Sequence, residues 1–279
     1  MTKKSSKFPS DAEVVIVGVG GIVGSMLAYW LTELGQKNIV GLEKSTVIPS
    51  DIASTAHASD FVYSTTHDKL SNWTTAFSRN FYEDNGFFLK KGGLEICRKD
   101  DDACWEELKR KVASGKAFGT NVRLISASEA KEKFPLLEEE SIRGAMWDPD
   151  AGLVTPRSQD VVRFAVESAK EKGALTTYTD TPAVGFEIEN GRVTGVKTDK
   201  GTIKTDKVVI ASGIWGPLMG GMAGVPVPLM PLEHPLLFFG PLPEAQGAED
   251  FLVYPLLRDQ GNSAYVRDTG RLHGGMLEW

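Results

Sequence analysis

The stretch that decides the fold is Glu13-Val-Val-Ile-Val-Gly18-Val-Gly20-Gly21-Ile-Val-Gly24, close to the start of the chain. Its β-branched run predicts a buried strand, and the glycines behind that run predict a tight turn that opens a helix. The helix is expected over residues 24–34, closed by Gly35, and a second strand over residues 38–42 ends at Glu43. This order is typical of a right-handed βαβ unit.

Residues 14–31 carry no charged side chain and contain Gly20-x-x-x-Gly24, a pattern that also fits a short membrane helix. The glycine cluster directly behind a β-branched run favours a strand and a turn instead. The basic start of the chain is followed by Phe8-Pro9-Ser10-Asp11 rather than by an apolar core, so no secretory signal is expected. We therefore expect a cytoplasmic protein that does not bind a membrane.

Composition indicates a globular protein with a large core. The 279 residues are 41% apolar and 24% charged, and the net charge is −6 with no stripe of Lys and Arg, which excludes nucleic acid as a partner. Cys97 and Cys104 have no second Cys/His pair at metal-ligand spacing, so we interpret them as reduced thiols and expect no metal site. The apolar final run, residues 271–279, leads us to expect a chain that is truncated at its C-terminus.

After Gly152 the sequence again predicts alternating helices and strands, as in the first βαβ unit. A helix is predicted from Thr155 to Lys172, followed by a strand over residues 174–178. A β-meander is predicted over residues 185–207, with turns at Asn190-Gly191 and Lys200-Gly201, and a further buried strand over residues 207–213. From Gly221 onward the chain is rich in proline and is predicted to alternate again as a sheet. The predicted fold class is α/β: a Rossmann-like domain with an inserted β-meander, interleaved with a smaller antiparallel α+β domain.

The predicted domain boundaries follow from this order. Residues 11–86 and 152–222 are assigned to the dinucleotide-binding domain, and residues 87–151 and 223–279 to an incomplete substrate domain. The first of these contains a strand, a glycine turn and a helix N-terminus, which together form an anion site for a pyrophosphate. Glu43 at the end of the second strand can accept both ribose hydroxyls and would repel the 2′-phosphate of NADP.

The glycine spacing in Gly18-Val-Gly20-Gly21-Ile-Val-Gly24 is one residue longer than the Gly-x-Gly-x-x-Gly fingerprint. A bulged turn would accommodate the extra residue. The alternative is a glycine-rich loop that only packs the helix against the strand.

Several motifs resemble those of one family and occur in the same order along nearly the whole chain. They are the glycine turn with Leu42-Glu43, Ser54-Thr55-Ala56-His57-Ala58, Gly92-Gly93-Leu94-Glu95, Ile210-Ala-Ser-Gly-Ile-Trp215-Gly and Pro231-Leu-Glu-His234. The chain looks like the FAD-dependent amine oxidoreductases of the dimethylglycine oxidase, dimethylglycine dehydrogenase and sarcosine dehydrogenase family. The resemblance implies FAD as the cofactor and an N-methylated amino acid as the small-molecule substrate, with folate as a partner in full-length relatives.

The resemblance also implies which residues contact FAD. It places Gly18, Gly20, Ile22, Val23 and Gly24 at the pyrophosphate turn. It places the remaining residues at the ribose (Glu43, Lys44), along the flavin (Ser54, Thr55, Ala56, His57, Phe61) and, through its backbone, near the adenine (Ala183). In this family the His of Ser-Thr-x-His-Ala carries the flavin covalently, so His57 would be bonded through a ring nitrogen to the 8α-methyl group. Without the family, His57 would be interpreted as a solvated loop residue.

The family's catalytic positions match His234 and Tyr265, which the resemblance puts over the flavin on the substrate-domain sheet. Hydride leaves the carbon next to nitrogen only when the nitrogen lone pair is free, and a histidine can take the proton of the amine while a tyrosine hydroxyl orients it. The residues alone would favour packed sheet positions for both. Arg258 and Arg267 are both candidates to hold a substrate carboxylate.

These observations predict an FAD-dependent oxidoreductase that oxidatively demethylates dimethylglycine or sarcosine. Three alternatives remain open: another FAD-dependent amine or amino-acid oxidase, a non-catalytic FAD-binding fragment, and an NAD-dependent dehydrogenase.

Overall fold

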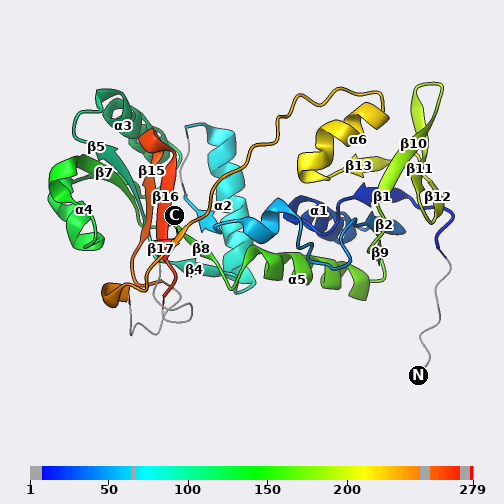
Figure 1. Ribbon diagram of the computed structural model, residues 1–279, viewed down its shortest axis with the longest axis horizontal. Coiled ribbons are helices and arrows are strands. Elements are labelled where there is room, and N and C mark those ends of the chain that lie inside the picture. The colour runs from blue at the N-terminus through cyan, green and yellow to red at the C-terminus, as the bar shows by residue number, and fades with distance from the viewer. Residues whose placement is uncertain (1–7, 65–66, 246–251, 271–276, 279) are drawn as a thin grey trace. The chain divides into compact units, whose positions relative to one another are not determined.

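The computed structural model describes residues 8–64, 67–245, 252–270 and 277–278. The chain forms two units, and each is built from two segments of sequence (Figure 1). Unit 1 comprises residues 1–59 and 156–233, and unit 2 comprises residues 60–155 and 234–279.

The sheet of unit 1 is parallel, with the strand order β13-β1-β2-β9. Its strands are β1 (Val14–Val17), β2 (Ile39–Leu42), β9 (Leu175–Tyr178) and β13 (Val208–Ile210). Every residue of β1 and β2 is buried, because both faces of the sheet are covered. The helices α1 (Ile22–Glu33) and α5 (Ser158–Glu171) lie side by side on one face (Figure 1).

Alternation along β1 sends its side chains to two different cores. Val14 and Ile16 pack with Ala28 of α1 and Val162 of α5. Val15 and Val17 pack on the other face, against a β-meander and α6 (Gly216–Met222). The meander consists of β10 (Ala183–Glu189), β11 (Arg192–Thr198) and β12 (Gly201–Lys204), paired in that order. Its first turn is Asn190-Gly191, where both residues have positive φ, as the sequence predicted.

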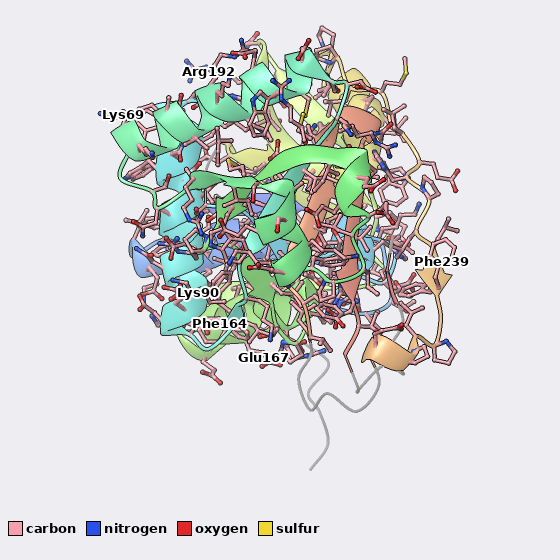
Figure 2. The ribbon with its side chains drawn as sticks, turned by 90° about the vertical axis from the view of Figure 1, so that its left-hand side faces the viewer. Lys69, Lys90, Phe164, Glu167, Arg192 and Phe239 are labelled. Carbon is pink, nitrogen blue, oxygen red and sulfur yellow. The ribbon has the colours of Figure 1, made fainter. Side chains whose placement is uncertain are left out.

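The main sheet of unit 2 has the order β14-β17-β16-β15-β5-β7-β6. The strands are β5 (Gly93–Arg98), β6 (Arg123–Ser126), β7 (Ile142–Asp148), β14 (Phe238–Phe239), β15 (Leu256–Asp259), β16 (Ala264–Asp268) and β17 (Leu277–Glu278). One face packs on α4 (Ala127–Lys133), and part of the other packs on α3 (Asp102–Ala117). Phe239 is labelled at β14, the edge strand of this sheet (Figure 2).

A second, three-stranded sheet completes unit 2. It has the order β3-β8-β4, with β3 (Phe61–Val62), β4 (Phe88–Lys90) and β8 (Gly152–Val154). The helix α2 (Lys69–Asp84) contacts β4. Short 3-10 helices occur at η1 (Ser54–His57), η2 (Glu139–Ser141), η3 (Gly213–Trp215), η4 (Pro243–Ala245) and η5 (Gln260–Asn262).

The predicted α/β class with an inserted meander is confirmed, and four details differ from the sequence expectation. Residues 60–86 belong to unit 2, because β3 pairs with β8 and α2 contacts β4. The second unit is as long as the first rather than smaller. Its main sheet is mixed, because β15 pairs with β5 in parallel. Residues 223–237 form no strand, since their prolines cannot donate to a ladder.

The uncharged stretch at residues 14–31 forms β1, the glycine turn and most of α1, as the glycines predicted. None of the helices in the described part of the chain has the length and apolar composition of a membrane span.

Candidate functional site

The glycine turn after β1 is packed so closely that side chains are excluded from it. Gly18 has φ +96°, and a Cβ atom there would lie 2.5 Å from the carbonyl oxygen of Ala211. A Cβ atom at Gly24 would lie 2.2 Å from the Gly18 oxygen, and one at Gly20 would lie 2.5 Å from Oε2 of Glu43. These distances are below any normal contact, so the turn requires glycine at all three positions.

The Glu43 side chain is buried directly beneath this turn. Its Oε2 accepts from the Gly20 N–H at 2.9 Å, and its Oε1 accepts from the Ser45 N–H at 2.8 Å and the Ser50 hydroxyl at 3.1 Å. A carboxylate offers about four acceptor positions, so one position on Oε2 is left for a ligand. Glu43 therefore holds the turn in place, a role that the sequence did not indicate.

The N-terminus of α1 presents backbone donors beside the turn. Its N-cap residue, Gly21, supplies no side-chain cap. The Ile22 N–H donates to Thr55 Oγ1 at 3.0 Å, whereas no hydrogen bond within the described chain engages the N–H groups of Gly21 and Val23. Free donors and the positive end of the helix dipole together favour an anion here.

A cavity of about 640 Å³ opens over these groups, and every residue that lines it belongs to unit 1. Its walls are the ends of β1 and β2, residues 50–55, residues 181–184 and parts of residues 210–229. Most of the lining is apolar, and the Lys44 ammonium lies 4.5 Å from the ring centre of Trp215. The Ser212 hydroxyl oxygen is buried at the wall, and none of the described residues forms a hydrogen bond with it. An unsatisfied buried hydroxyl is costly, so this atom fits a site completed by a polar ligand.

The structure brings most of the predicted cofactor residues to this cavity. Eight of them line it: Gly18, Ile22, Val23, Glu43, Lys44, Ser54, Thr55 and Ala183. Gly20 and Gly24 lie behind the lining in the packed turn. Ala56, His57 and Phe61 are not among the lining residues; His57 ends η1 with an exposed side chain, and Phe61 lies in β3 of unit 2.

Several residues of the cavity wall had no role in the sequence prediction, among them Ser212, Trp215 and Val184. Ser212 and Trp215 belong to a run of sequence that was used only for the family resemblance, and nothing in that run indicated that the Ser212 hydroxyl would be buried and unpaired. Val184 lines the cavity at a register shift between Ala183 and Gly185, which leaves it outside the β10–β11 pairing. A bulge of this kind cannot be predicted from alternation alone.

Tyr265 and Arg258 lie side by side in unit 2. Tyr265 of β16 is the register partner of Arg258 of β15, and Arg258 is in turn the partner of Glu95 of β5. The Phe61 ring meets the Tyr265 ring edge-on, with centroids 5.3 Å apart. The Arg258 guanidinium carbon lies 5.7 Å from the ring centre of Tyr63.

The tyrosine at position 63 is kept neutral by its surroundings. Its hydroxyl donates to the Leu94 carbonyl oxygen at 3.2 Å. Burial raises the pKa of Tyr63 well above its usual range, the Glu95 carboxylate raises it further, and the Arg258 cation opposes them. Glu95 itself accepts from the Lys111 ammonium at 2.5 Å, and both side chains of this ion pair are buried.

His234 does not lie on a sheet, in contrast to the expectation from the resemblance. It is exposed in the irregular proline-rich segment, between Pro231 and Pro235. Among the described residues, no hydrogen bond or ring contact joins His234 to Tyr265. The described residues contain no group of three or more His, Cys, Asp or Glu side chains that could hold a metal ion.

Nearly the whole chain matches the model of one protein family. The model of the FAD dependent oxidoreductase family matches residues 13–277. The chain belongs to this family. The resemblance inferred from the motifs is therefore confirmed, and FAD is the family's cofactor. The packed glycine turn, the free donors of α1 and the unsatisfied Ser212 hydroxyl fit such a cofactor.

Curated proteins similar to this chain match nearly all of it, whereas the chain spans about a third of their length. The mitochondrial sarcosine dehydrogenase of Homo sapiens is 28% identical over 95% of this chain, which spans 29% of the relative's length. The 4-methylaminobutanoate oxidase (formaldehyde-forming) of Paenarthrobacter nicotinovorans is 31% identical over 97% of the chain and 32% of its own length. The mitochondrial pyruvate dehydrogenase phosphatase regulatory subunit of Mus musculus is 30% identical, with coverages of 97% and 31%.

A solved structure supports the same fold. L-proline dehydrogenase from P. horikoshii matches with a TM-score of 0.81 and 29% identity, over 97% of this chain and 70% of that one.

Proposed function

We propose that the protein oxidatively demethylates an N-methylated amino acid, with dimethylglycine or sarcosine as the substrate and FAD as the electron acceptor. The observation that carries this proposal is the similarity over nearly the whole chain to a sarcosine dehydrogenase and a formaldehyde-forming methylaminobutanoate oxidase, in a chain whose unit 1 cavity fits FAD. The oxidised product would be an imine that water hydrolyses to formaldehyde and the demethylated amine.

Unit 1 supplies the groups that would bind FAD. The free N–H groups at the start of α1 suit the pyrophosphate, and the remaining acceptor position of Glu43 suits a ribose hydroxyl. Ser212 offers its unpaired hydroxyl, and the apolar wall with Trp215 covers flat aromatic groups. When bound, FAD supplies the two-electron acceptor for the amine.

The amine must lose a proton before its neighbouring carbon can lose hydride. An amine with a pKa near that of lysine, about 10.4, is almost entirely protonated at neutral pH. We propose that His234 accepts the proton of the amine and that the hydroxyl of Tyr265 orients the amine. The exposure of the His234 side chain leaves it available to a substrate, and the edge-on contact with Phe61 holds Tyr265 in a defined position.

His57 is proposed to attach the flavin covalently. It follows Ser54 and Thr55, which line the cavity, and its exposed imidazole is not engaged by a hydrogen bond in the described part of the chain. Intact mass separates the possibilities: the proposal expects wild type to retain an FAD mass after acid and His57→Ala to lose it. Flavin that acid releases from wild type would contradict the link.

The function is tested by anaerobic mixing of FAD-loaded protein with sarcosine, dimethylglycine, L-proline or D-alanine. Loss of the flavin's visible absorbance with the N-methyl compounds, together with formaldehyde release, is the expected result. Reduction by proline or alanine alone would favour another amino-acid oxidase, as the L-proline dehydrogenase likeness would allow. If the protein binds FAD but none of the amines reduces it, a non-catalytic role would be favoured. The similarity to a regulatory subunit supports this second candidate.

The cellular location stays a prediction. We expected the cytoplasm from the sequence, whereas the sarcosine dehydrogenase relative is mitochondrial by name.

A further inference from the structure

A second, smaller cavity lies within unit 2, between β3 and α2, the cyan helix of Figure 1. It has a volume of about 270 Å³ and is lined by residues 61–63 and by Thr74, Thr75, Ser78 and Tyr82 of α2. All of these residues belong to unit 2, whereas every residue that lines the larger cavity belongs to unit 1. The unit 2 cavity is therefore a site of its own, separate from the one that fits FAD.

Aromatic rings and hydroxyl groups form the walls of the unit 2 cavity. Phe61 and Tyr63 contribute rings from the strand side, and Tyr82 contributes one from the helix. Thr75, Ser78 and Tyr82 are three and four residues apart, which puts their hydroxyls on one face of α2. Within the described chain these three hydroxyls form no hydrogen bond with another residue. They are therefore available to a ligand.

The charge around the unit 2 cavity selects the class of ligand. None of its lining residues is charged. Without a lining cation the cavity does not suit a carboxylate or a phosphate, and without a lining carboxylate it does not suit a strongly hydrated metal ion. Burial raises the pKa of Tyr82, and the buried Asp60 carboxylate raises it further, so the electrostatic potential at this tyrosine is negative. A negative potential favours a cation.

The two arginines near the cavity do not cancel this potential. Arg79 of α2 is paired with Glu83, at 3.7 Å between Nε and Oε1. Arg258 lies over the Tyr63 ring, but the Glu95 carboxylate raises the pKa of Tyr63 by more than Arg258 lowers it. The potential is therefore negative at both tyrosines of the wall.

We infer that the unit 2 cavity binds a small methylated ammonium ion. Such an ion is weakly hydrated, and the negative faces of aromatic rings attract it. The rings of Phe61, Tyr63 and Tyr82 supply these faces, and the hydroxyl oxygens of α2 supply acceptors for any N–H group that the ion retains. A volume of about 270 Å³ is just below the range of sites for drug-sized ligands, which suits a small ion. This binding site goes beyond the proposed function and does not depend on it.

The test compares choline with its neutral isostere 3,3-dimethylbutanol, which has carbon in place of the charged nitrogen. Binding of both to FAD-loaded protein is measured by isothermal titration calorimetry. Wild type is expected to bind choline about 3–30-fold more tightly, the usual range for a cation on aromatic rings. Tyr82→Leu should lose this preference, whereas Tyr82→Phe should keep it because the ring remains. Trp73→Leu is the matched control, because it removes an aromatic ring from an exposed position of α2 that does not line the cavity.

A second pair of variants tests the charge of the ligand. Ser78→Lys places a cation in the wall of the cavity and should weaken choline binding at least tenfold, roughly the repulsion of two nearby like charges. Asn80→Lys adds the same charge at an exposed position of the same helix that does not line the cavity, and it should bind choline as wild type does.

Each outcome decides the inference. Equal binding of the two probes by wild type, or absence of choline binding, would overturn it. A preference for choline that survives in folded Tyr82→Leu and in folded Ser78→Lys would place the ion elsewhere and would overturn it as well. Circular dichroism spectra show which variants are folded, and Ser78→Lys, at a half-buried position, provides the test if Tyr82→Leu is not. Flavin reduction by N-methyl amino acids is measured separately, so the proposed function can fail while the cation site stands.

Discussion

Replacement of Glu43 by alanine would remove an acceptor from three buried donors at once. The Gly20 and Ser45 amides and the Ser50 hydroxyl all donate to this carboxylate. The hydroxyl can rotate toward another acceptor, but the two amides cannot, and each buried unsatisfied donor costs about 1–3 kcal/mol. The free energy of unfolding should therefore fall by about 2–6 kcal/mol in Glu43→Ala, a large share of the roughly 5–15 kcal/mol typical of a folded domain.

The assay is urea unfolding of the FAD-free protein, followed by circular dichroism. Glu189→Ala is the matched control, because Glu189 is exposed at the end of β10 and its removal should change the free energy of unfolding by less than about 0.5 kcal/mol. Glu43→Gln should give an intermediate loss, since its amide keeps one carbonyl acceptor. A Glu43→Ala protein as stable as Glu189→Ala would refute the role of Glu43 in holding the turn.

Three further substitutions and one labelling experiment have defined outcomes. Gly20→Val should abolish FAD binding, because the new side chain would meet Glu43 and Ser50 at 2.5–2.7 Å; unchanged flavin content would count against it. Ser212→Ala should leave the stability of the FAD-free protein unchanged or slightly raised and weaken FAD binding by about tenfold, as expected for one lost hydrogen bond, whereas an unaltered FAD affinity would show that its hydroxyl is not used. His234→Ala should slow flavin reduction by about 10²–10⁴-fold in stopped flow, the usual scale of general-base catalysis, and an unchanged rate at saturating substrate would exclude this role. Burial raises the pKa of Cys104 to about 12, so its thiol should resist Ellman's reagent at pH 8 until the protein is unfolded; rapid labelling of the native protein would contradict this.

The first βαβ unit could be predicted because each of its signals is local. The β-branched run before Gly18 favours a strand, and the glycines that follow it indicate a tight turn. In the structure this turn leaves no room for side chains at Gly18, Gly20 and Gly24. The Asn190-Gly191 turn was predictable for the same reason, since both residues tolerate positive φ.

Features that depend on distant partners could not be predicted in this way. The placement of α2 in unit 2 depends on contacts with β4, and the parallel pairing of β15 with β5 joins strands far apart in the chain. Likewise, the buried ion pair between Lys111 of α3 and Glu95 of β5 joins residues that no local pattern connects. In the sequence, Arg258 and Arg267 were equivalent, because burial and partners are tertiary properties.

The central claim is that the unit 1 cavity binds FAD, and equilibrium dialysis of flavin-free protein against FAD tests it most directly. We predict that wild type binds FAD at a single site, that Gly20→Val binds none, and that Arg110→Gln, changed only on the surface of unit 2, binds as wild type does. Absence of FAD binding by folded wild type, or equal binding by wild type and folded Gly20→Val, would contradict the account.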